Sequence, residues 1–546
     1  MTLVSSVVGA ALEAIPAPHR LDIECTPRPM PHPRTRKLPL VDLGSNTARL
    51  VVFEFEAGHW FRMHDSIREP IRLGEGLAKE GRLTAEAIDR AVAALTLFAD
   101  FAAGAGLPHP HVLCTSAVRE AANGEELLAR VRPLELPLEV LPGEEEARLG
   151  VIAVANGFAF ENAWVVDMGG GSAQVSRMRE RRFDGGGSHP LGAVRLTERF
   201  LPSDPPTADE IATLEAFLER ELADAGRGIA ESDAELVAMG GTIRNLARAL
   251  QVVDDYPLDL LHNFHLDRAR FEALTEDMLG MPAARRARTF DINPDRADLL
   301  PAGAVLFRHL LRVSDRDHLV VSGHGVREGA FFRWFLPVPH RLPDVTRFSV
   351  LNVAQQYGQT AAHVSRVRRL AQRLFEILAP LHRLTARDRV ILDAAAALHD
   401  IGMAVDYHRH HKHGAYLALT QPLSGFDHRE QALISLLIRY HRKGKPTLGS
   451  YRPLMGSGDA RRLRQLATCL RLAEQLERAR TGRVHDLSLT QLDGTVYLRA
   501  HSAQQPVVEL WEAAKHADLF ESAFGRSLVI ESRTEPEPVR RRSLIV

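Results

Sequence analysis

Apolar and polar residues alternate with two different periods along the chain. Within residues 84–103, Ile88, Val92, Leu95 and Phe98 recur at helical spacing and predict one buried stripe of a helix. Shorter apolar runs on either side, several of them ending in glycines, are typical of strands. Up to about residue 336 the predicted strands and helices alternate, which indicates an α/β layered fold.

The pattern changes after a proline-containing stretch at residues 337–343, which predicts a linker. From there to about residue 476 the apolar spacing is helical throughout. Between residues 484 and 530, strand-like runs such as 496–500 and 507–511 accompany one helical segment and predict a small α+β piece. Residues 531–546 predict a loose tail.

The most informative stretch is residues 165–178 (VVDMGGGSAQVSRM), which reads as strand, tight turn, strand. The first run ends in Asp167, and Gly169, Gly170, Gly171 and Ser172 form the turn. Glycines can adopt φ > 0, and successive N–H groups in such a turn form a concave anion site. By itself, the stretch is equally compatible with an ordinary glycine hairpin and a solvated aspartate.

A second copy of this pattern favours phosphate binding. Residues 40–53 (LVDLGSNTARLVVF) repeat the order of apolar run, Asp42, turn and apolar run, with Gly44, Ser45 and Asn46 in the turn. The two aspartates lie 125 positions apart, so a whole supersecondary unit is duplicated. Two such hairpins could face each other across a cleft and hold a phosphate chain from both sides.

Length and composition set the wider limits. A chain of 546 residues is too long for one core, and 45% apolar with 25% charged residues is ordinary for a globular protein. The net charge of −1 means that attraction of an anion must come from local patches. Three widely spaced cysteines, no long apolar run and no basic start to the apolar N-terminus predict a cytoplasmic protein without a membrane span.

Three successive glutamates and one arginine are candidates for chemistry. Glu144, Glu145 and Glu146 open a predicted helix, where acidic side chains also complement the helix dipole. They point in different directions, so at most two could face a cleft. A carboxylate directed at a phosphate makes sense if it activates water or holds a metal. Arg119 could clamp a phosphate, or could form a surface ion pair.

Eight ordered segments between residues 37 and 333 together resemble the exopolyphosphatase/guanosine pentaphosphate phosphohydrolase family. They are residues 42–46 (DLGSN), 115–123 (TSAVREAAN), 143–148 (GEEEAR), 167–172 (DMGGGS), 190–198 (PLGAVRLTE), 240–245 (GGTIRN), 293–298 (NPDRAD) and 322–329 (SGHGVREG). The resemblance implies two actin-like (ribonuclease H-like) lobes of the acetate and sugar kinase/Hsp70/actin superfamily. It also implies hydrolysis of a terminal phosphoanhydride with Mg²⁺ or Mn²⁺ and no organic cofactor.

The resemblance also assigns roles by position. Glu146 matches the family's water-activating glutamate, Asp42 and Asp167 match two loop aspartates near metal and water, and Arg119 matches a phosphate-binding arginine. The phosphate loops correspond to Gly44, Ser45, Asn46, Gly169, Gly170, Gly171 and Ser172. One departure is Gln174, where the family usually has glutamate. We expect this amide to weaken metal binding without abolishing the chemistry.

The helical half carries a second candidate site. His399 and Asp400, with His363 upstream, resemble the core of the HD metal-dependent phosphohydrolases, and Glu474 stands where a further aspartate is usual. A purely structural role for these side chains is the alternative, because buried polar groups normally find partners. A histidine-rich segment at residues 407–413 is compatible with a metal site, an anion site or a solvated face.

These observations predict a domain plan: a flexible lead-in (residues 1–36), lobe I (37–160), lobe II (161–336), an all-α HD-like domain (337–480), and a small α+β subdomain with the tail (481–546). The leading function is a homodimeric exopolyphosphatase that releases orthophosphate from the end of inorganic polyphosphate. Guanosine pentaphosphate is the alternative substrate, because the motifs are shared. Two rival functions are a polyphosphate-binding or nucleotide-binding sensor with little turnover, and a kinase of the same superfamily. Neither a nucleic acid duplex nor a membrane is expected as a partner.

Overall fold

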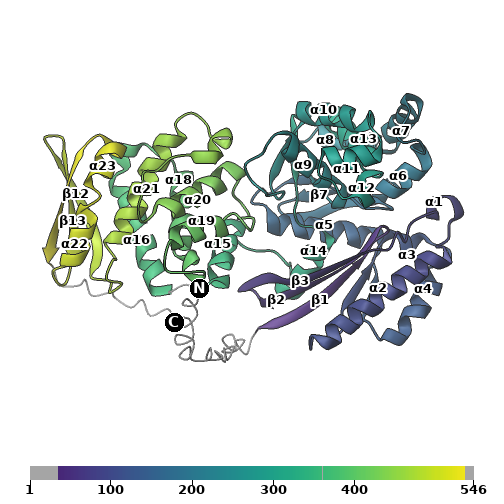
Figure 1. The fold of residues 1–546 in the computed structure, drawn as a ribbon, viewed down its shortest axis with the longest axis horizontal. Coiled ribbons are helices and arrows are strands. Elements are labelled where there is room, and N and C mark those ends of the chain that lie inside the picture. The colour runs from purple at the N-terminus through teal and green to yellow at the C-terminus, as the bar shows by residue number, and fades with distance from the viewer. Residues whose placement is uncertain (1–34, 359–360, 535–546) are drawn as a thin grey trace, which may run out of the picture. The chain divides into compact units, whose positions relative to one another are not determined.

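The structure is a computed structural model that describes residues 35–358 and 361–534. Of the predicted lead-in (residues 1–36), only Thr35 and Arg36 are described, and Arg36 already begins the first strand, so lobe I starts one residue earlier than predicted. Most of the predicted tail lies outside the described residues. Two sheet-containing lobes are followed by a helical domain and a small third sheet (Figure 1). This is the α/β architecture with a helical second half that the sequence predicts.

Lobe I is built on a five-stranded sheet with the order β3-β2-β1-β4-β5. Strands β1 to β3 are antiparallel, whereas β1, β4 and β5 run parallel. The elements of lobe I are β1 (Arg36–Leu43), β2 (Thr47–Glu56), β3 (Trp60–Pro70), α1 (Leu77–Glu80), α2 (Ala85–Gly104), β4 (His111–Cys114), α3 (Ser116–Glu120), α4 (Gly124–Val131), η1 (Arg132–Leu134), β5 (Leu138–Val140) and α5 (Gly143–Gly157). The helix predicted at residues 84–103 is present as α2. Ile88, Leu95 and Phe98 of its predicted apolar stripe are buried.

Lobe II repeats this topology. Its sheet has the order β10-β11-β9-β6-β7-β8, so without the added edge strand β10 it reads β8-β7-β6-β9-β11, as in lobe I. The elements are β6 (Ala163–Met168), β7 (Ala173–Arg179), β8 (Arg182–His189), α6 (Ala193–Phe200), α7 (Ala208–Glu221), α8 (Ala223–Ala230), β9 (Glu235–Met239), α9 (Gly241–Val253), β10 (Phe264–Asp267), α10 (Arg268–Leu279), α11 (Ala283–Thr289), α12 (Pro294–Ala297), α13 (Leu300–Val313), β11 (His318–Val321) and α14 (Val326–Phe335). The duplication predicted from the two glycine turns therefore extends to the whole order of strands.

Helices α5 and α14 pack against each other where the lobes meet. A Cβ atom on Gly329 of α14 would lie 2.0 Å from the backbone oxygen of Leu149 in α5, so only glycine permits this approach. Around the crossing, buried side chains of lobe I such as Phe53 and Phe55 share an apolar cluster with Phe331 and Phe335 of α14. Hydrophobic packing therefore fixes the two helices whose N-termini reach the cleft between the lobes.

The helical domain and the small sheet share one hydrophobic core, which runs from Val350 to Leu528. The elements are α15 (Val345–Gln356), α16 (Ala361–Ile377), α17 (Ala379–His382), α18 (Ala386–Leu398), η2 (Ile401–Ala404), α19 (His410–Leu417), α20 (His428–Tyr440), η3 (Gly449–Leu454), α21 (Asp459–Gln475), β12 (Val484–Leu492), β13 (Thr495–Ser502), α22 (Val507–Ala514), α23 (Ala517–Phe524) and β14 (Ser527–Thr534). The expected α+β piece is present as the sheet β12-β13-β14 with α22 and α23.

Two local expectations for this part were wrong. Residues 507–511 form the start of helix α22 and not a strand. Val507, Val508 and Trp511 are exposed, whereas Leu510 packs against the core and Glu509 and Ala513 are buried. Helical packing therefore overrides the strand preference of the two valines. Residues 531–534, predicted to belong to the tail, complete β14, which pairs in parallel with β13.

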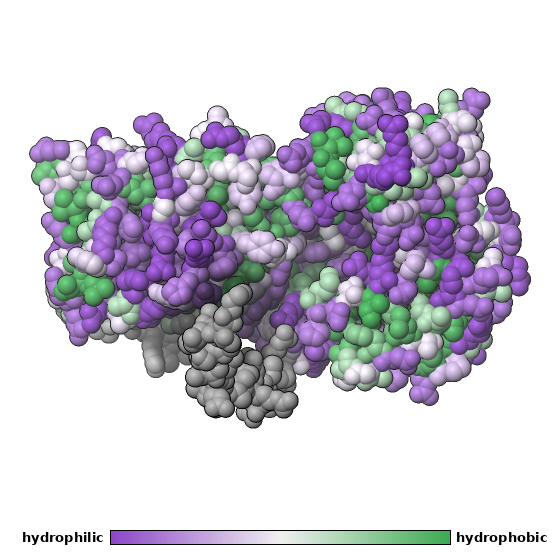
Figure 2. All heavy atoms as spheres, in the orientation of Figure 1, coloured by the Kyte–Doolittle hydropathy of each residue, from purple (hydrophilic) through white to green (hydrophobic). Residues whose placement is uncertain are grey.

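The surface is mainly hydrophilic on the face drawn in Figure 2, with small apolar groups scattered between polar ones. Within the described residues, every helix is too short or too polar to span a bilayer.

Candidate functional site

The two glycine turns meet between the lobes. A Cβ atom on Gly170 would lie 3.0 Å from the Cβ of Ser45, and one on Gly171 would lie 2.8 Å from the Ser45 Oγ and 2.6 Å from the Ser116 Oγ. The turns after β1 and β6 therefore approach so closely that a side chain at either glycine would separate them. This is the facing arrangement that the duplicated pattern predicts.

Next to these turns lies a cavity of about 250 Å³, which we call the interlobe cleft. Most of the predicted site residues line it: Asp42, Gly44, Ser45, Asn46, Glu146, Asp167, Gly169, Gly170 and Ser172. Gly171 instead packs against Ser45 and Ser116, and Arg119 reaches the cleft through its contact with Glu146. The structure thus brings together both halves of the predicted site.

Glu146 is the acidic side chain of the α5 first turn that faces the cleft. Its side chain is largely buried, whereas Glu144 is exposed and pairs with Arg148. Arg119 Nη1 donates to Glu146 Oε2 at 3.0 Å and to the Leu141 backbone oxygen at 2.6 Å. Burial raises the pKa of Glu146 to about 7, although Arg119 opposes the shift. A carboxyl with this pKa can exchange a proton near neutral pH.

Asp42 and Asp167 end equivalent strands of the two lobes. Burial raises the pKa of Asp167 to about 6 and also raises the pKa of Asp42, while nearby arginines lower both. Gly240 adopts φ 102°, and a Cβ atom there would lie 2.9 Å from Asp167 Oδ1. The buried Glu146 and the partly exposed Asp42 and Asp167 therefore line one space whose occupation by a cation would relieve their mutual repulsion.

Five arginines complete the cleft, and the sequence analysis assigned none of them. They are Arg49, Arg68, Arg244, Arg296 and Arg327. Burial and mutual repulsion lower the pKa values of Arg49 and Arg296 to about 10, so both stay charged at neutral pH. The sequence contained a signal for two of these arginines, because Arg244 and Arg296 belong to segments that carried the family resemblance. Arg49 is the residue of β2 that pairs with Asp42 of β1.

Gln174 contributes an amide to the same wall. Its Nε2 donates to Ser172 Oγ at 2.9 Å and to Ser188 Oγ at 3.1 Å, and its side chain is buried. The amide therefore orders two hydroxyls, one of them in the glycine turn, and brings no negative charge to the cleft.

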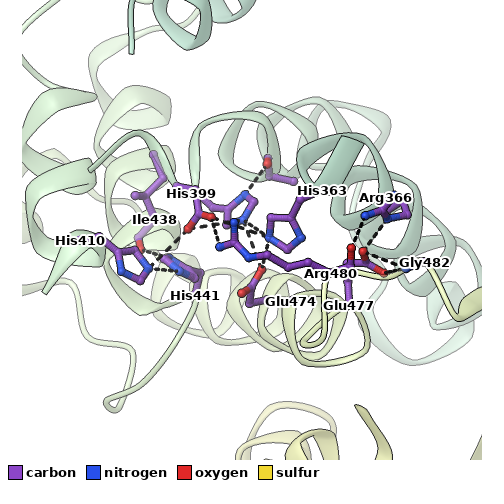
Figure 3. A network of polar contacts seen from close by, with 12 residues as sticks. His363, Arg366, His399, His410, Ile438, His441, Glu474, Glu477, Arg480 and Gly482 are labelled. Carbon is purple, nitrogen blue, oxygen red and sulfur yellow. Dashed lines mark hydrogen bonds and ion pairs between the residues drawn. The ribbon is translucent and has the colours of Figure 1, made fainter. Parts of the chain in front are cut away.

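The helical domain contains a separate cluster of buried histidines and carboxylates (Figure 3). His363 Nε2 and His399 Nε2 each lie 3.2 Å from Glu474 Oε2, and His363 Nε2 lies 3.8 Å from Asp400 Oδ2. The sequence analysis placed His363, His399, Asp400 and Glu474 in one candidate site, and the structure confirms that they lie together. The sequence analysis did not assign His441, and it noted His410 only as part of the segment 407–413.

Comparison with known proteins gives a consistent result. The Ppx/GppA phosphatase family matches residues 51–337, and its domain III matches residues 345–507. Exopolyphosphatase 1 of Mycobacterium tuberculosis is 30% identical over 302 residues, which are 54% of this chain and 88% of the relative. Exopolyphosphatase 2 of the same organism is 32% identical over 305 residues, 53% of this chain and 95% of the relative.

A solved structure supports the fold. A crystal structure of an exopolyphosphatase from Cytophaga hutchinsonii superimposes with a TM-score of 0.52 at 22% identity, covering 55% of this chain and 98% of that one.

Proposed function

Because the chain belongs to the Ppx/GppA phosphatase family, we propose that it is an exopolyphosphatase that hydrolyses the terminal phosphoanhydride of inorganic polyphosphate and releases orthophosphate. The observation that carries the proposal is the interlobe cleft, where five arginines and two glycine turns surround Glu146. In such a site the arginines bind a polyanion, and Glu146 is a proton acceptor beside the terminal phosphate of that polyanion.

The arginines and the turns bind the phosphoryl group in this scheme. Arg244, Arg296 and Arg327 come from three different segments of lobe II, so their guanidinium groups approach a phosphate from different sides. Backbone N–H groups of the turns after β1 and β6 add neutral donors. Charge that develops on the phosphoryl oxygens in the transition state is then stabilised by groups already in place.

Glu146 accepts a proton from the attacking water, and Arg119 positions it. The ion pair of 3.0 Å and the second bond of Arg119 to Leu141 hold the carboxylate in one orientation. Of the three glutamates that open α5, Glu146 lines the cleft. In-line attack on the terminal phosphorus needs a single oriented water, which a fixed carboxylate supplies.

A divalent cation fits the carboxylates of the cleft, and we propose that it is Mg²⁺, with Mn²⁺ as the substitute. Asp42 and Asp167 supply hard oxygen ligands, which such ions prefer, and both line the interlobe cleft. When bound, the ion neutralises charge on the phosphate chain. Gln174 adds no charge, so we expect weak binding of the ion.

A larger cavity favours a substrate longer than one phosphate group. It has a volume of about 720 Å³ and shares Arg49, Arg244 and Arg327 with the interlobe cleft. Residues of the helical domain, such as Ser349 and Ser424, line its other side. Further phosphate groups of a chain can therefore follow the terminal one past the same arginines.

The same cavity supports guanosine pentaphosphate as a second candidate substrate. The partly exposed Phe61 and Phe348 line it, and aromatic rings of this kind can stack on a nucleobase. Polyphosphate would use the arginines of this cavity, whereas guanosine pentaphosphate would also use its aromatic rings for stacking.

The test measures orthophosphate release from polyphosphate and from guanosine pentaphosphate, separately and in competition, for wild type and Glu146→Gln. We expect polyphosphate to be the better substrate and Glu146→Gln to reduce release by about 10³-fold. Glu144→Gln, on the same helical turn but exposed, is the matched control and should keep wild-type rates. Equal release by Glu146→Gln and wild type would contradict the proposed role. Tight binding of polyphosphate without release by wild type would instead support a sensor.

We also propose the domain boundaries given by the sequence, a cytoplasmic location and a homodimer. The location is supported by the widely spaced cysteines, of which Cys114 and Cys469 are buried and unpaired. The dimer is supported by Val507, Val508 and Trp511, which are exposed on α22 in the second half of the chain. Sedimentation analysis of wild type and Trp511→Glu tests the dimer, and a monomeric wild type would contradict it.

A further inference from the structure

Gln174 stands in a row of polar side chains that crosses the sheet of lobe II. In the register of β6, β7 and β8, Asp167 pairs with Gln174, and Gln174 pairs with Ser188. Residues directly opposite each other on neighbouring strands place their side chains on the same face of the sheet. Ser172 ends the turn between β6 and β7 and lines the interlobe cleft, as do Asp167 and Gln174. The fold therefore places a neutral amide between a carboxylate and a hydroxyl, beside the glycine turn.

The amide nitrogen of Gln174 determines the direction of two hydrogen bonds. Gln174 Nε2 lies 2.9 Å from Ser172 Oγ and 3.1 Å from Ser188 Oγ, and the side chains of Gln174 and Ser172 are buried. An amide nitrogen only donates, so both serine oxygens are acceptors. A hydroxyl whose oxygen accepts still has its own proton to donate, and accepting one bond strengthens the bond that it donates.

The proton of Ser172 is available to a ligand of the cleft. Among the described residues, Gln174 is the one hydrogen-bond partner of Ser172 Oγ. A buried hydroxyl normally finds an acceptor for its proton as well. Because Ser172 lines the interlobe cleft together with Arg244 and Arg296, a phosphoryl oxygen held by these arginines is the acceptor that fits.

We propose that Gln174 is a positioning residue that keeps the proton of Ser172 directed at the phosphoryl group of the substrate. The inference rests on the proposed hydrolysis of a phosphoanhydride in this cleft. Ser172 donates to a phosphoryl oxygen, and this bond strengthens as negative charge develops there in the transition state. Gln174 acts through Ser172 and not by contact with the phosphate.

A glutamate at position 174 would reverse both hydrogen bonds. A carboxylate only accepts, so the hydroxyls of Ser172 and Ser188 would both donate to it, and the proton of Ser172 would turn away from the substrate. The bridge between the two serines would nevertheless remain. The carboxylate would also lie directly opposite Asp167, where like charges are unfavourable. Glutamine and glutamate therefore differ in the direction of the bonds and in charge, but not in the number of bonds that they can form here.

The test measures kcat and KM for orthophosphate release from polyphosphate, with each variant at its own saturating Mg²⁺ concentration. Ser172→Ala should lower kcat by about 10–100-fold, because a hydrogen bond to a charged group is lost. Gln174→Met keeps the length of the side chain without either bond, and it should lower kcat less than Gln174→Glu does. Gln505→Glu is the matched control, because this exposed glutamine accepts from Ser532 outside the cleft, and it should behave as wild type.

A double variant separates positioning from charge repulsion and from a structural role. In the Ser172→Ala background, Gln174→Glu should lower kcat by less than about threefold, because the hydroxyl that Gln174 orients is already absent. Repulsion between Glu and the phosphate would persist in this background, and so would a loss of stability. Thermal unfolding identifies variants that fail to fold, and Gln174→Met with Ser172→Ala forms a second cycle if Gln174→Glu is one of them.

Two results would overturn the inference while the proposed function stands. The first is a kcat of Gln174→Glu equal to or above that of Gln174→Met, because a purely structural bridge is kept by glutamate and lost in methionine. The second is full additivity of the substitutions at Ser172 and Gln174. Absence of orthophosphate release by wild type would instead overturn the proposed function, and the inference with it.

Discussion

The interlobe cleft and the buried cluster of the helical domain both gather carboxylates, but different side chains balance the negative charge. In the cleft the partners are arginines, which stay protonated and offer only donors. In the helical cluster they are mainly histidines, and Glu474 Oε2 lies 3.2 Å from both His363 Nε2 and His399 Nε2. The comparison shows that the carboxylates beside arginines line an open cavity, whereas those beside histidines are packed into the interior of a domain.

Among the changes that test this comparison, the largest effect is expected from removing one arginine of the cleft. Arg244→Ala should lower kcat/KM for polyphosphate by about 10²–10³-fold, because the positive charge that we propose contacts the phosphate is lost. The measurement is orthophosphate release at several substrate concentrations. Arg227→Ala, an exposed arginine of lobe II, is the control and should behave as wild type. A value for Arg244→Ala within threefold of wild type would place the substrate elsewhere.

The second prediction concerns pH. Because burial raises the pKa of Glu146 to about 7, this carboxyl is mostly protonated below pH 7 and cannot accept a proton. The rate should therefore rise about tenfold from pH 5 to pH 6, rise further through pH 7 and level off above about pH 8. A pH profile of kcat/KM measures this. A flat acidic limb would contradict the assignment of Glu146 as the base.

Gln174→Glu makes the cleft more like the helical cluster. It adds a carboxylate to the wall that holds Ser172, and we expect the Mg²⁺ concentration for half-maximal rate to fall about fivefold. Titration of the rate with Mg²⁺ measures the change, and Gln491→Glu, an exposed glutamine on β12 outside the cleft, is the control. An increased requirement for Mg²⁺ would mean that the two bonds donated by Gln174 matter more than charge.

The sequence predicted the repeated parts of the molecule better than the parts that depend on packing. Two copies of apolar run, aspartate and glycine turn were enough to place Asp42 and Asp167 at equivalent strand ends, because this relation is local. The arginines of the cleft were not assigned, since they come from segments far apart in the chain and only the fold brings them together. The strand predicted at residues 507–511 failed because burial on α22 follows helical packing and not the preference of valine.

The helical cluster shows the same limit. Adjacent His399 and Asp400 are recognisable in sequence, whereas His441 is an isolated histidine at the end of a helix. Its place in the cluster depends on the fold, which brings His441 Nε2 to 3.2 Å from His410 Nε2, and this proximity cannot be read from residue spacing.

The crossing of α5 and α14 constrains how the enzyme can move. Gly329 and Leu149 touch at backbone level, so the two helices cannot slide past each other without losing this contact. We therefore expect Glu146, near the start of α5, and Arg327, near the start of α14, to keep their spacing when the lobes shift, because both side chains belong to helices that are locked at the crossing.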